Sequence, residues 1–297
     1  MIHRLKVLIL ATLLASGLFI VSNHWRVDAA AKRDLAEAPT DMHDRGPFRD
    51  PPAVEARRSD RRVPGPSIDP YVRPEFAGEM RTLQPVILAA AKRHNRADLS
   101  GMSDHDFAVL IALIMYNEHF GWFEERVTPV QVLTPFYENL QRQTNEAGIS
   151  DLSVWPANIR PSVALEILRQ QVPLPHATGV LTVPISVAGS TIVPDSFESQ
   201  GALYAAITAE ITQPEMAVEY LAANLERGLY RAQIEGVPAT WRALAAWHNQ
   251  GIVAPEDIRR NRTASDYLRR ASAYFGKARA LIDLRPPHIP AAKYLVE

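Results

Sequence analysis

The sequence predicts a mostly α-helical domain with one small β or irregular insertion, preceded by an N-terminal transmembrane or signal segment and a disordered linker. Apolar residues recur at helical spacing through most of the chain after residue 73. One stretch, 172–193, instead alternates and is rich in β-branched residues, as in a small hairpin or an irregular flap. The first 72 residues hold an uncharged apolar run and then a proline-rich stretch. We therefore expect three parts, 1–27, 28–72 and 73–297.

The bulk composition limits the function classes. A chain of 297 residues with a hydrophobic fraction of 47% can form one large domain or two small ones with a real core. The 32 basic and 33 acidic residues give a net charge of -1, which provides no general attraction for nucleic acid or anionic lipid. The absence of cysteine excludes disulfides, cysteine nucleophiles and thiolate metal sites.

The N-terminus carries the clearest targeting signal. Arg4 and Lys6 precede residues 7–22, which contain no charge. At about 1.5 Å per residue, this run falls a little short of the ~30 Å hydrocarbon core, so it lies between a signal-peptide core and a short membrane anchor. We favour an uncleaved anchor over cleavage near residues 28–31. In both cases the remainder of the chain is exported, which predicts an extracytoplasmic domain.

Residues 28–72 are rich in arginine, aspartate, proline and alanine and show little apolar periodicity. Because proline interrupts helices and little apolar surface is available for burial, we expect a disordered or extended spacer. Such a linker would give the following domain reach away from the membrane. Within that domain, the predicted helices are 76–94, a helix that begins at the capping residue Ser103, and 161–171, 200–210, 213–235, 240–249 and 264–284.

Glu118 is the candidate catalytic residue. The helix that begins near Ser103 has an apolar stripe formed by Phe107, Leu110, Ile111, Ile114 and Met115. Position 118 is seven residues after Ile111 and therefore points the same way within about 20°. Burial and the negative end of the helix dipole both disfavour a charged carboxylate there. A carboxylic acid that stays protonated suits glycosidic bond cleavage. The alternative is that Glu118 ends the helix and reaches solvent.

The segment YNEHFGWFEE, residues 116–125, resembles the catalytic-glutamate segment of the goose-type lysozyme and soluble lytic transglycosylase superfamily. In that superfamily a glutamate ends a long buried helix. The resemblance extends over roughly residues 75–285. It implies a lysozyme-like fold, with Glu118 as the catalytic residue.

A second block, SVWPANIRPS at 153–162, resembles the family's glycine-x-x-glutamine-isoleucine-x-proline-serine/threonine block, which lines the sugar cleft. Trp155 replaces the glycine and Asn158 replaces the glutamine. The resemblance implies substrate contacts from Ser153, Trp155, Asn158 and Arg160.

Two further blocks follow in the family's order. QPEMAVEYL at 213–221 resembles the helix that opens with aspartate-proline-glutamate and runs into tyrosine-leucine. AWHNQG at 246–251 resembles the alanine-x-tyrosine-asparagine-x-glycine block, with histidine in place of a tyrosine that lies near the catalytic glutamate. These blocks imply substrate contacts from Tyr220, Trp247, His248 and Asn249.

The resemblance implies cleavage of the MurNAc–GlcNAc bond of peptidoglycan, on the periplasmic or cell-wall side of a bacterial cytoplasmic membrane. A hydrolase would use a second carboxylate, for which Glu124, Glu125 and Asp151 are candidates, although the first two resemble a solvated pair and Asp151 a cap. We favour the one-glutamate lytic transglycosylase. The altered positions motivate an alternative, a glycan-binding or scaffolding module with little activity. A third possibility is an unrelated exported helical domain.

Other features lead to negative expectations. Four histidines, His105, His119, His176 and His248, lack ligand spacing, so we expect no metal and no cofactor. Trp122, Trp155, Trp241 and Trp247 could stack on sugars, although Trp241 is expected in the core.

Overall fold

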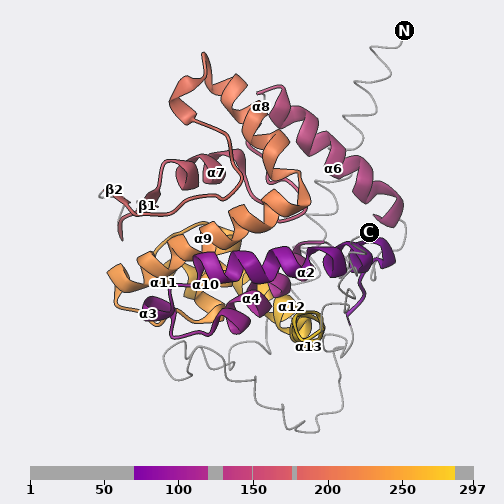
Figure 1. Cartoon of the computed structure of the whole chain (residues 1–297), viewed down its shortest axis with the longest axis vertical. Helices are drawn as coiled ribbons and strands as arrows, with labels where there is room; N and C mark the ends of the chain where they lie inside the picture. Colours follow the sequence, from indigo (N-terminus) through magenta and orange to yellow (C-terminus); the bar gives the residue numbers. More distant parts are fainter. Residues whose placement is uncertain (1–69, 120–129, 149, 176–178, 285–297) are drawn as a thin grey trace, which may run out of the picture. The chain divides into compact units, whose positions relative to one another are not determined.

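The computed structural model describes residues 70–119, 130–148, 150–175 and 179–284, all of which belong to one compact unit (Figure 1). This part of the chain is mostly helical, as predicted, with one two-stranded sheet. The helices are α2 (Pro74–His94), α3 (Ala97–Ser100), α4 (Asp104–Glu118), α6 (Val130–Glu146), α7 (Pro161–Leu168), α8 (Gln200–Ile211), α9 (Pro214–Glu235), α10 (Trp241–Gln250), α11 (Pro255–Arg260), α12 (Arg262–Ala273), α13 (Phe275–Ile282) and the short 3₁₀ helix η3 (Pro194–Ser196). The predicted N-terminal anchor and most of the linker lie outside the described residues.

Helix α4 is the centre of the fold. Every residue from Phe107 to Glu118 is buried, and α2, α9, α10, α12 and α13 all contact this helix. Ser103 caps it as predicted, because its hydroxyl accepts a hydrogen bond of 3.1 Å from the Asp106 amide. The prediction of a single apolar stripe on this helix has to be corrected. The helix is apolar on all sides, and such a helix is surrounded by other elements rather than packed on one face.

Predicted helix bounds agree with the structure within two residues for α2, α8, α9 and α10. The predicted helix 161–171 ends at Leu168, because residues 171–173 enter a strand. The predicted helix 264–284 is wrong as a single helix. The α-helical hydrogen-bond pattern is interrupted at Tyr274, whose amide donates to the carbonyl of Ala271 three residues earlier, and α13 begins at the next residue.

Of the two alternatives for residues 172–193, a small hairpin or an irregular flap, the structure has a short hairpin followed by an irregular segment. Strand β1 (Gln171–Pro173) pairs in antiparallel fashion with β2 (Val180–Thr182), with Val172 opposite Leu181. The chain after β2 is fastened to two helices by buried carboxylates. The Ala188 amide donates to Glu219 of α9 at 3.1 Å, and the Thr191 amide donates to Glu210 of α8 at 3.3 Å. The insertion therefore has a fixed position against the helical core.

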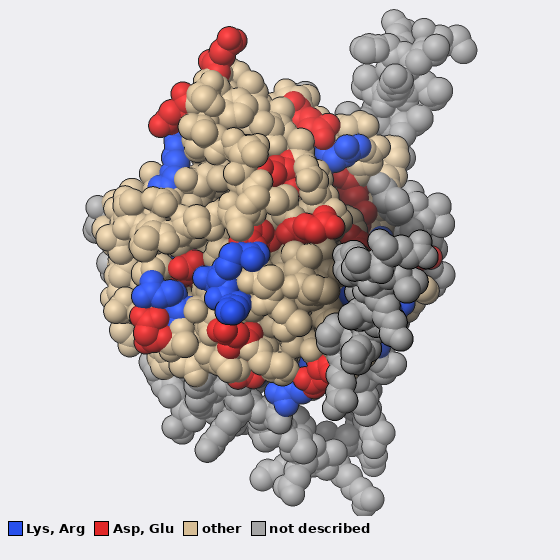
Figure 2. Space-filling model, viewed as in Figure 1, with Lys and Arg blue, Asp and Glu red and all other residues tan. Residues whose placement is uncertain are grey.

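Two further observations concern membrane-spanning helices and surface charge. Within the described ranges, no helix is both long and apolar enough to cross a membrane. Figure 2 shows acidic and basic side chains interspersed on the face in view, without a large area of one sign.

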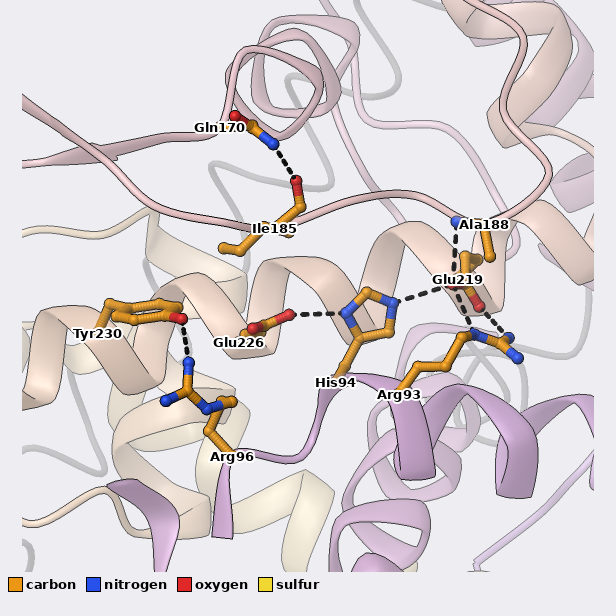
Figure 3. A network of polar contacts seen from close by, with 9 residues as sticks. All are labelled: Arg93, His94, Arg96, Gln170, Ile185, Ala188, Glu219, Glu226 and Tyr230. Carbon is orange, nitrogen blue, oxygen red and sulfur yellow. Dashed lines mark hydrogen bonds and ion pairs between the residues drawn. The ribbon is translucent and has the colours of Figure 1, made fainter. Parts of the chain in front are cut away.

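Buried charges join α2 to α9 (Figure 3). The His94 imidazole lies between two carboxylates of α9, with Nε2 at 3.0 Å from Glu219 and Nδ1 at 2.9 Å from Glu226. Arg93 also donates to Glu219, at 2.5 and 3.0 Å. Burial alone would lower the pKa of His94, but its hydrogen bonds to both glutamates outweigh burial and raise that pKa. Burial would raise the pKa of Glu219, but His94 and Arg93 lower it.

These pKa directions predict a pH-dependent stability. Because the pKa of His94 is raised, its contribution is fully present below the ordinary value of 6.5 and is lost as the pH rises through the raised value. Because the pKa of Glu219 is lowered, its contribution is present above the ordinary value of 4.5 and is lost as the pH falls through the lowered value. The contribution of this cluster to the free energy of unfolding, measured by urea denaturation, should be largest between these ordinary values.

His94→Leu should make this contribution visible, because it leaves two buried carboxylates without their shared partner. We expect a loss of roughly 3 to 5 kcal/mol at about pH 6. The matched control is His105→Leu, since His105 is an exposed histidine paired with Asp283 at 2.7 Å. That control should change stability by less than about 1 kcal/mol. Equal stability losses in the two variants would contradict the role given to His94.

Candidate active site around Glu118

Glu118 ends the central helix α4 and keeps only 10% of its side chain exposed. Three elements from distant parts of the sequence meet at its carboxylate. Oε2 accepts a 2.7 Å hydrogen bond from Asn158 Nδ2, and Oε1 accepts a 2.6 Å hydrogen bond from the Tyr267 hydroxyl. His248 Nε2 lies 3.6 Å from Oε1. The alternative that Glu118 points into bulk solvent is therefore wrong.

Asn158 lies in a tight loop that closes over the end of α4. The loop is held by an antiparallel bridge between Val154 and Ile159, with a 2.9 Å hydrogen bond from the Val154 amide. Asn158 has φ of 51°, in the left-handed region that asparagine tolerates better than most residues. Its Nδ2 also donates to the Glu118 backbone carbonyl at 3.2 Å. The predicted cleft residue Asn158 is thus in direct contact with the predicted catalytic residue.

Tyr267 is a site residue that the sequence analysis missed. It comes from α12, is buried, and is separated from Glu118 by 149 residues. Burial raises the pKa of the Tyr267 hydroxyl, and the charge and hydrogen bond of Glu118 raise it further. The resemblance places a tyrosine near the glutamate at position 248, but here a phenol reaches the carboxylate from another helix. No local motif marks Tyr267, so no sequence signal was available to find it.

Arg270 adds a positive charge near the carboxylate. It lies one turn after Tyr267 on α12. Burial lowers the pKa of Arg270, whereas the negative charge of Glu118 acts in the opposite direction. The neutral Asn158 amide and the neutral Tyr267 phenol also donate hydrogen bonds to Glu118.

A groove of about 400 Å³ contains Trp155 of the loop that carries Asn158, although Glu118 itself is not among its lining residues. It is lined by Val154 and Trp155 of the loop, Glu138, Asn139 and Arg142 of α6, and Thr212. Arg73 links the groove to the end of α4. Its guanidinium lies 5.9 Å from the Trp155 ring centroid and donates to Glu138 at 3.3 Å and to the His119 carbonyl at 3.2 Å. His119 directly follows Glu118, so the aromatic wall and the carboxylate belong to one region.

Two predicted substrate residues have other positions. Tyr220 is buried, and its hydroxyl donates to Glu210 at 2.5 Å. Trp247 is also buried, and its indole nitrogen donates to the Val253 carbonyl at 2.9 Å. Because their polar atoms already have protein partners within the core, these side chains offer no surface to a substrate. This placement corrects the expectation for Tyr220 and Trp247, whereas Trp241 lies in the core as expected.

The other predicted residues lie near the loop or on α10. Ser153 is half-buried beside the bridge, and Arg160 is exposed at the start of α7. Asn249 is half-buried and accepts a hydrogen bond from Gln250.

The carboxylates considered for a second catalytic role do not join this site in the described residues. Asp151 caps α7, since its carboxylate accepts 2.9 and 2.5 Å hydrogen bonds from the amide and hydroxyl of Ser162. Glu124 and Glu125 lie outside the described residues, as do Trp122 and His176. In the ranges that are described, no group of three or more histidine, aspartate or glutamate side chains could hold a metal ion.

The contact between Tyr267 and Glu118 can be tested through stability. Tyr267→Phe removes only the hydroxyl and leaves a buried carboxylate with one donor fewer. We expect a loss of roughly 1.5 to 3 kcal/mol in urea denaturation, the range for a hydrogen bond to a charged group. The control is Tyr274→Phe, whose hydroxyl donates to the neutral Tyr71 carbonyl at 3.2 Å. A larger loss in Tyr274→Phe would argue against the contact.

Comparison with known proteins does not identify the function of this site. No known protein family, no curated protein and no solved structure matches this chain. Its function is therefore inferred from the arrangement around Glu118 and from the sequence motifs that converge there.

Proposed function

We propose that this chain is a lysozyme-like, glycan-cleaving domain that acts on the MurNAc–GlcNAc bond of peptidoglycan, with Glu118 as general acid and then general base. One observation carries the proposal. A glutamate at the end of a helix that is buried from Phe107 onward accepts hydrogen bonds from two separate elements, and a histidine of a third element lies 3.6 Å away. The loop that supplies Asn158 also supplies Trp155 to a neighbouring groove. Preorganised hydrogen-bonding groups around a titratable residue are typical of catalytic centres.

The contacts suit an acid that becomes a carboxylate during the reaction. Protonated Glu118 would give its proton to the glycosidic oxygen as the bond from that oxygen to the sugar C1 breaks. Negative charge then develops on the carboxylate, where the Asn158 amide and the Tyr267 hydroxyl donate at 2.7 and 2.6 Å. These donors interact more strongly with the charged product of proton transfer than with the neutral acid. They would therefore lower the barrier to that transfer.

The second half of the reaction uses the same group. The Glu118 carboxylate takes the proton of the muramic C6 hydroxyl, and the C6 oxygen forms a bond to C1. A 1,6-anhydro ring results, and Glu118 recovers its proton. This sequence needs one carboxylate, in agreement with the use of Asp151 as a helix cap.

The groove offers matching chemistry for a saccharide. The Trp155 ring supplies an apolar face for a sugar ring. Arg142, Asn139 and Glu138 supply donors and acceptors for hydroxyl, amide and carboxylate groups along the opposite wall. We place the domain on the extracytoplasmic side of a bacterial membrane, attached through its N-terminal apolar segment.

A binding or scaffolding module is the second candidate, and a specific observation favours it. Both carboxylate oxygens of Glu118 already have protein partners, and the side chain is only 10% exposed. Such a module would bind glycan strands in the groove without cleaving them.

Glu118→Gln should separate the two candidates, because the amide cannot donate an acidic proton. We expect zymography on cell-wall substrate to show at least a roughly 100-fold loss of clearing, the lower range for general acid catalysis. The control is Glu215→Gln, an exposed glutamate in the first turn of α9, which should clear normally. Equal clearing by wild type and Glu118→Gln, or none by either, would refute the proposed enzyme. Mass spectrometry of the released fragments would distinguish anhydro products from hydrolysis products.

Trp155→Ala should weaken binding to purified glycan strands about 10-fold, which corresponds to the roughly 1.4 kcal/mol of a stacked ring. Trp155→Phe keeps an aromatic face and should retain most of the affinity. The measurement is isothermal titration with the Glu118→Gln background, so that no substrate is cleaved. Unchanged affinity in Trp155→Ala would exclude the groove as the binding site.

A further inference from the structure

We infer that Asn224 and Arg227 of α9 hold His248 as the neutral imidazole with its proton on Nε2, the nitrogen that faces Glu118. The inference deepens the proposed function and rests on it, since it assigns positioning residues to the same carboxylate. It follows from the side-chain atoms that can only donate a hydrogen bond and from those that can only accept one.

Arg227 fixes the orientation of the Asn224 amide. The Arg227 side chain is only 1% exposed, and its guanidinium has only donors. Its Nε donates to the Gln171 carbonyl at 2.7 Å, one terminal nitrogen donates to the Asn224 oxygen at 3.0 Å, and the other pairs with Glu166. The Asn224 atom that faces Arg227 must therefore be the oxygen. The amide nitrogen is left pointing the other way.

The oriented amide then selects the histidine tautomer. Asn224 Nδ2 lies 3.4 Å from His248 Nδ1. An amide NH2 group can only donate, so Nδ1 has to present its lone pair. A neutral imidazole with an unprotonated Nδ1 carries its proton on Nε2.

The proton on Nε2 faces an acceptor, because Glu118 Oε1 lies 3.6 Å from His248 Nε2. A second proton on Nδ1 would direct one N–H group against another, with the Arg227 cation behind it. Burial of the imidazole lowers the pKa of His248, and this effect exceeds the opposing influence of Glu118. Geometry and burial thus both favour the neutral ring.

Other titratable groups surround His248. They are Tyr267 and Arg270 on α12, Arg227 on α9 and Glu166 on α7. Glu166 accepts a hydrogen bond from Arg227, so its negative charge is paired with Arg227 rather than with the imidazole.

A neutral His248 ring is important for Glu118 as an acid catalyst. An imidazolium close to Glu118 would stabilise the carboxylate before the reaction and make proton donation harder. A neutral N–H group still points toward Oε1 and interacts more strongly once negative charge develops there. Asn224 and Arg227 are therefore positioning residues that act on Glu118 through His248.

The tautomer can be observed without any activity assay. Long-range ¹H–¹⁵N correlation spectra of the full-length chain, labelled with ¹⁵N-histidine, distinguish the two neutral tautomers from the imidazolium. The His248 signals are assigned by their absence in His248→Gln. We expect one protonated nitrogen, Nε2, near neutral pH. An imidazolium near neutral pH, or a proton on Nδ1, would overturn the inference whether or not the protein cleaves glycan.

Asn224→Asp tests the consequence, because it replaces the donor by an acceptor of the same shape. The aspartate would accept a hydrogen bond from a protonated Nδ1, so the His248 spectrum should change to that of the imidazolium. Cleavage should then fall, because a cation beside Glu118 stabilises the carboxylate before the reaction. Asn224→Leu, which supplies neither donor nor acceptor, should keep the ring neutral through burial but remove the selection of the tautomer, so that Nε2 is no longer the one protonated nitrogen.

The outcomes separate this inference from the proposed function. An imidazolium in Asn224→Asp with undiminished cleavage would overturn the positioning role. Absence of wild-type cleavage would refute the proposed enzyme, while the wild-type spectrum would still decide the tautomer. The wild-type spectrum also decides the tautomer if the Asn224→Asp variant folds poorly.

Discussion

The burial of one carboxylate organises this domain. Helix α4 is enclosed on every side, so the glutamate that ends it cannot rely on water for all of its hydrogen bonds. A buried carboxylate without partners is strongly unfavourable. Its partners come from the loop before α7, from α10 and from α12, which are far apart in sequence. The requirement to solvate Glu118 thus brings together the elements that form the candidate site.

Helix α9 supports that arrangement through a second set of buried polar groups. Glu219 and Glu226 hold His94 of α2 and, through the Ala188 amide, the segment after the hairpin. Arg227 holds the Gln171 carbonyl in the hairpin as well as the Asn224 amide. Because an unpaired buried charge is far more costly than a broken surface pair, each of these contacts fixes the position of a neighbouring element. The candidate site is therefore built on a polar framework inside an apolar core.

The groups that touch the Glu118 carboxylate are matched to a change of charge. An amide and a phenol donate to it directly, and the imidazole lies slightly further away. These contacts agree with the proton transfer proposed for Glu118 and with the positioning of a neutral His248.

The sequence by itself determined the local features. The Ser103 cap, the long apolar run before Glu118 and the spacing in α2, α9 and α10 each depend on residues within a few turns, so their helices could be predicted. The break at Tyr274 has no glycine or proline to mark it, and α6 contains a proline and many polar residues, so both were missed. Only the tertiary structure decided that Tyr267 reaches Glu118, that Tyr220 and Trp247 face the core, and which nitrogen of His248 faces the carboxylate. Those contacts join residues up to 149 positions apart, and they depend on how whole helices pack rather than on any local pattern.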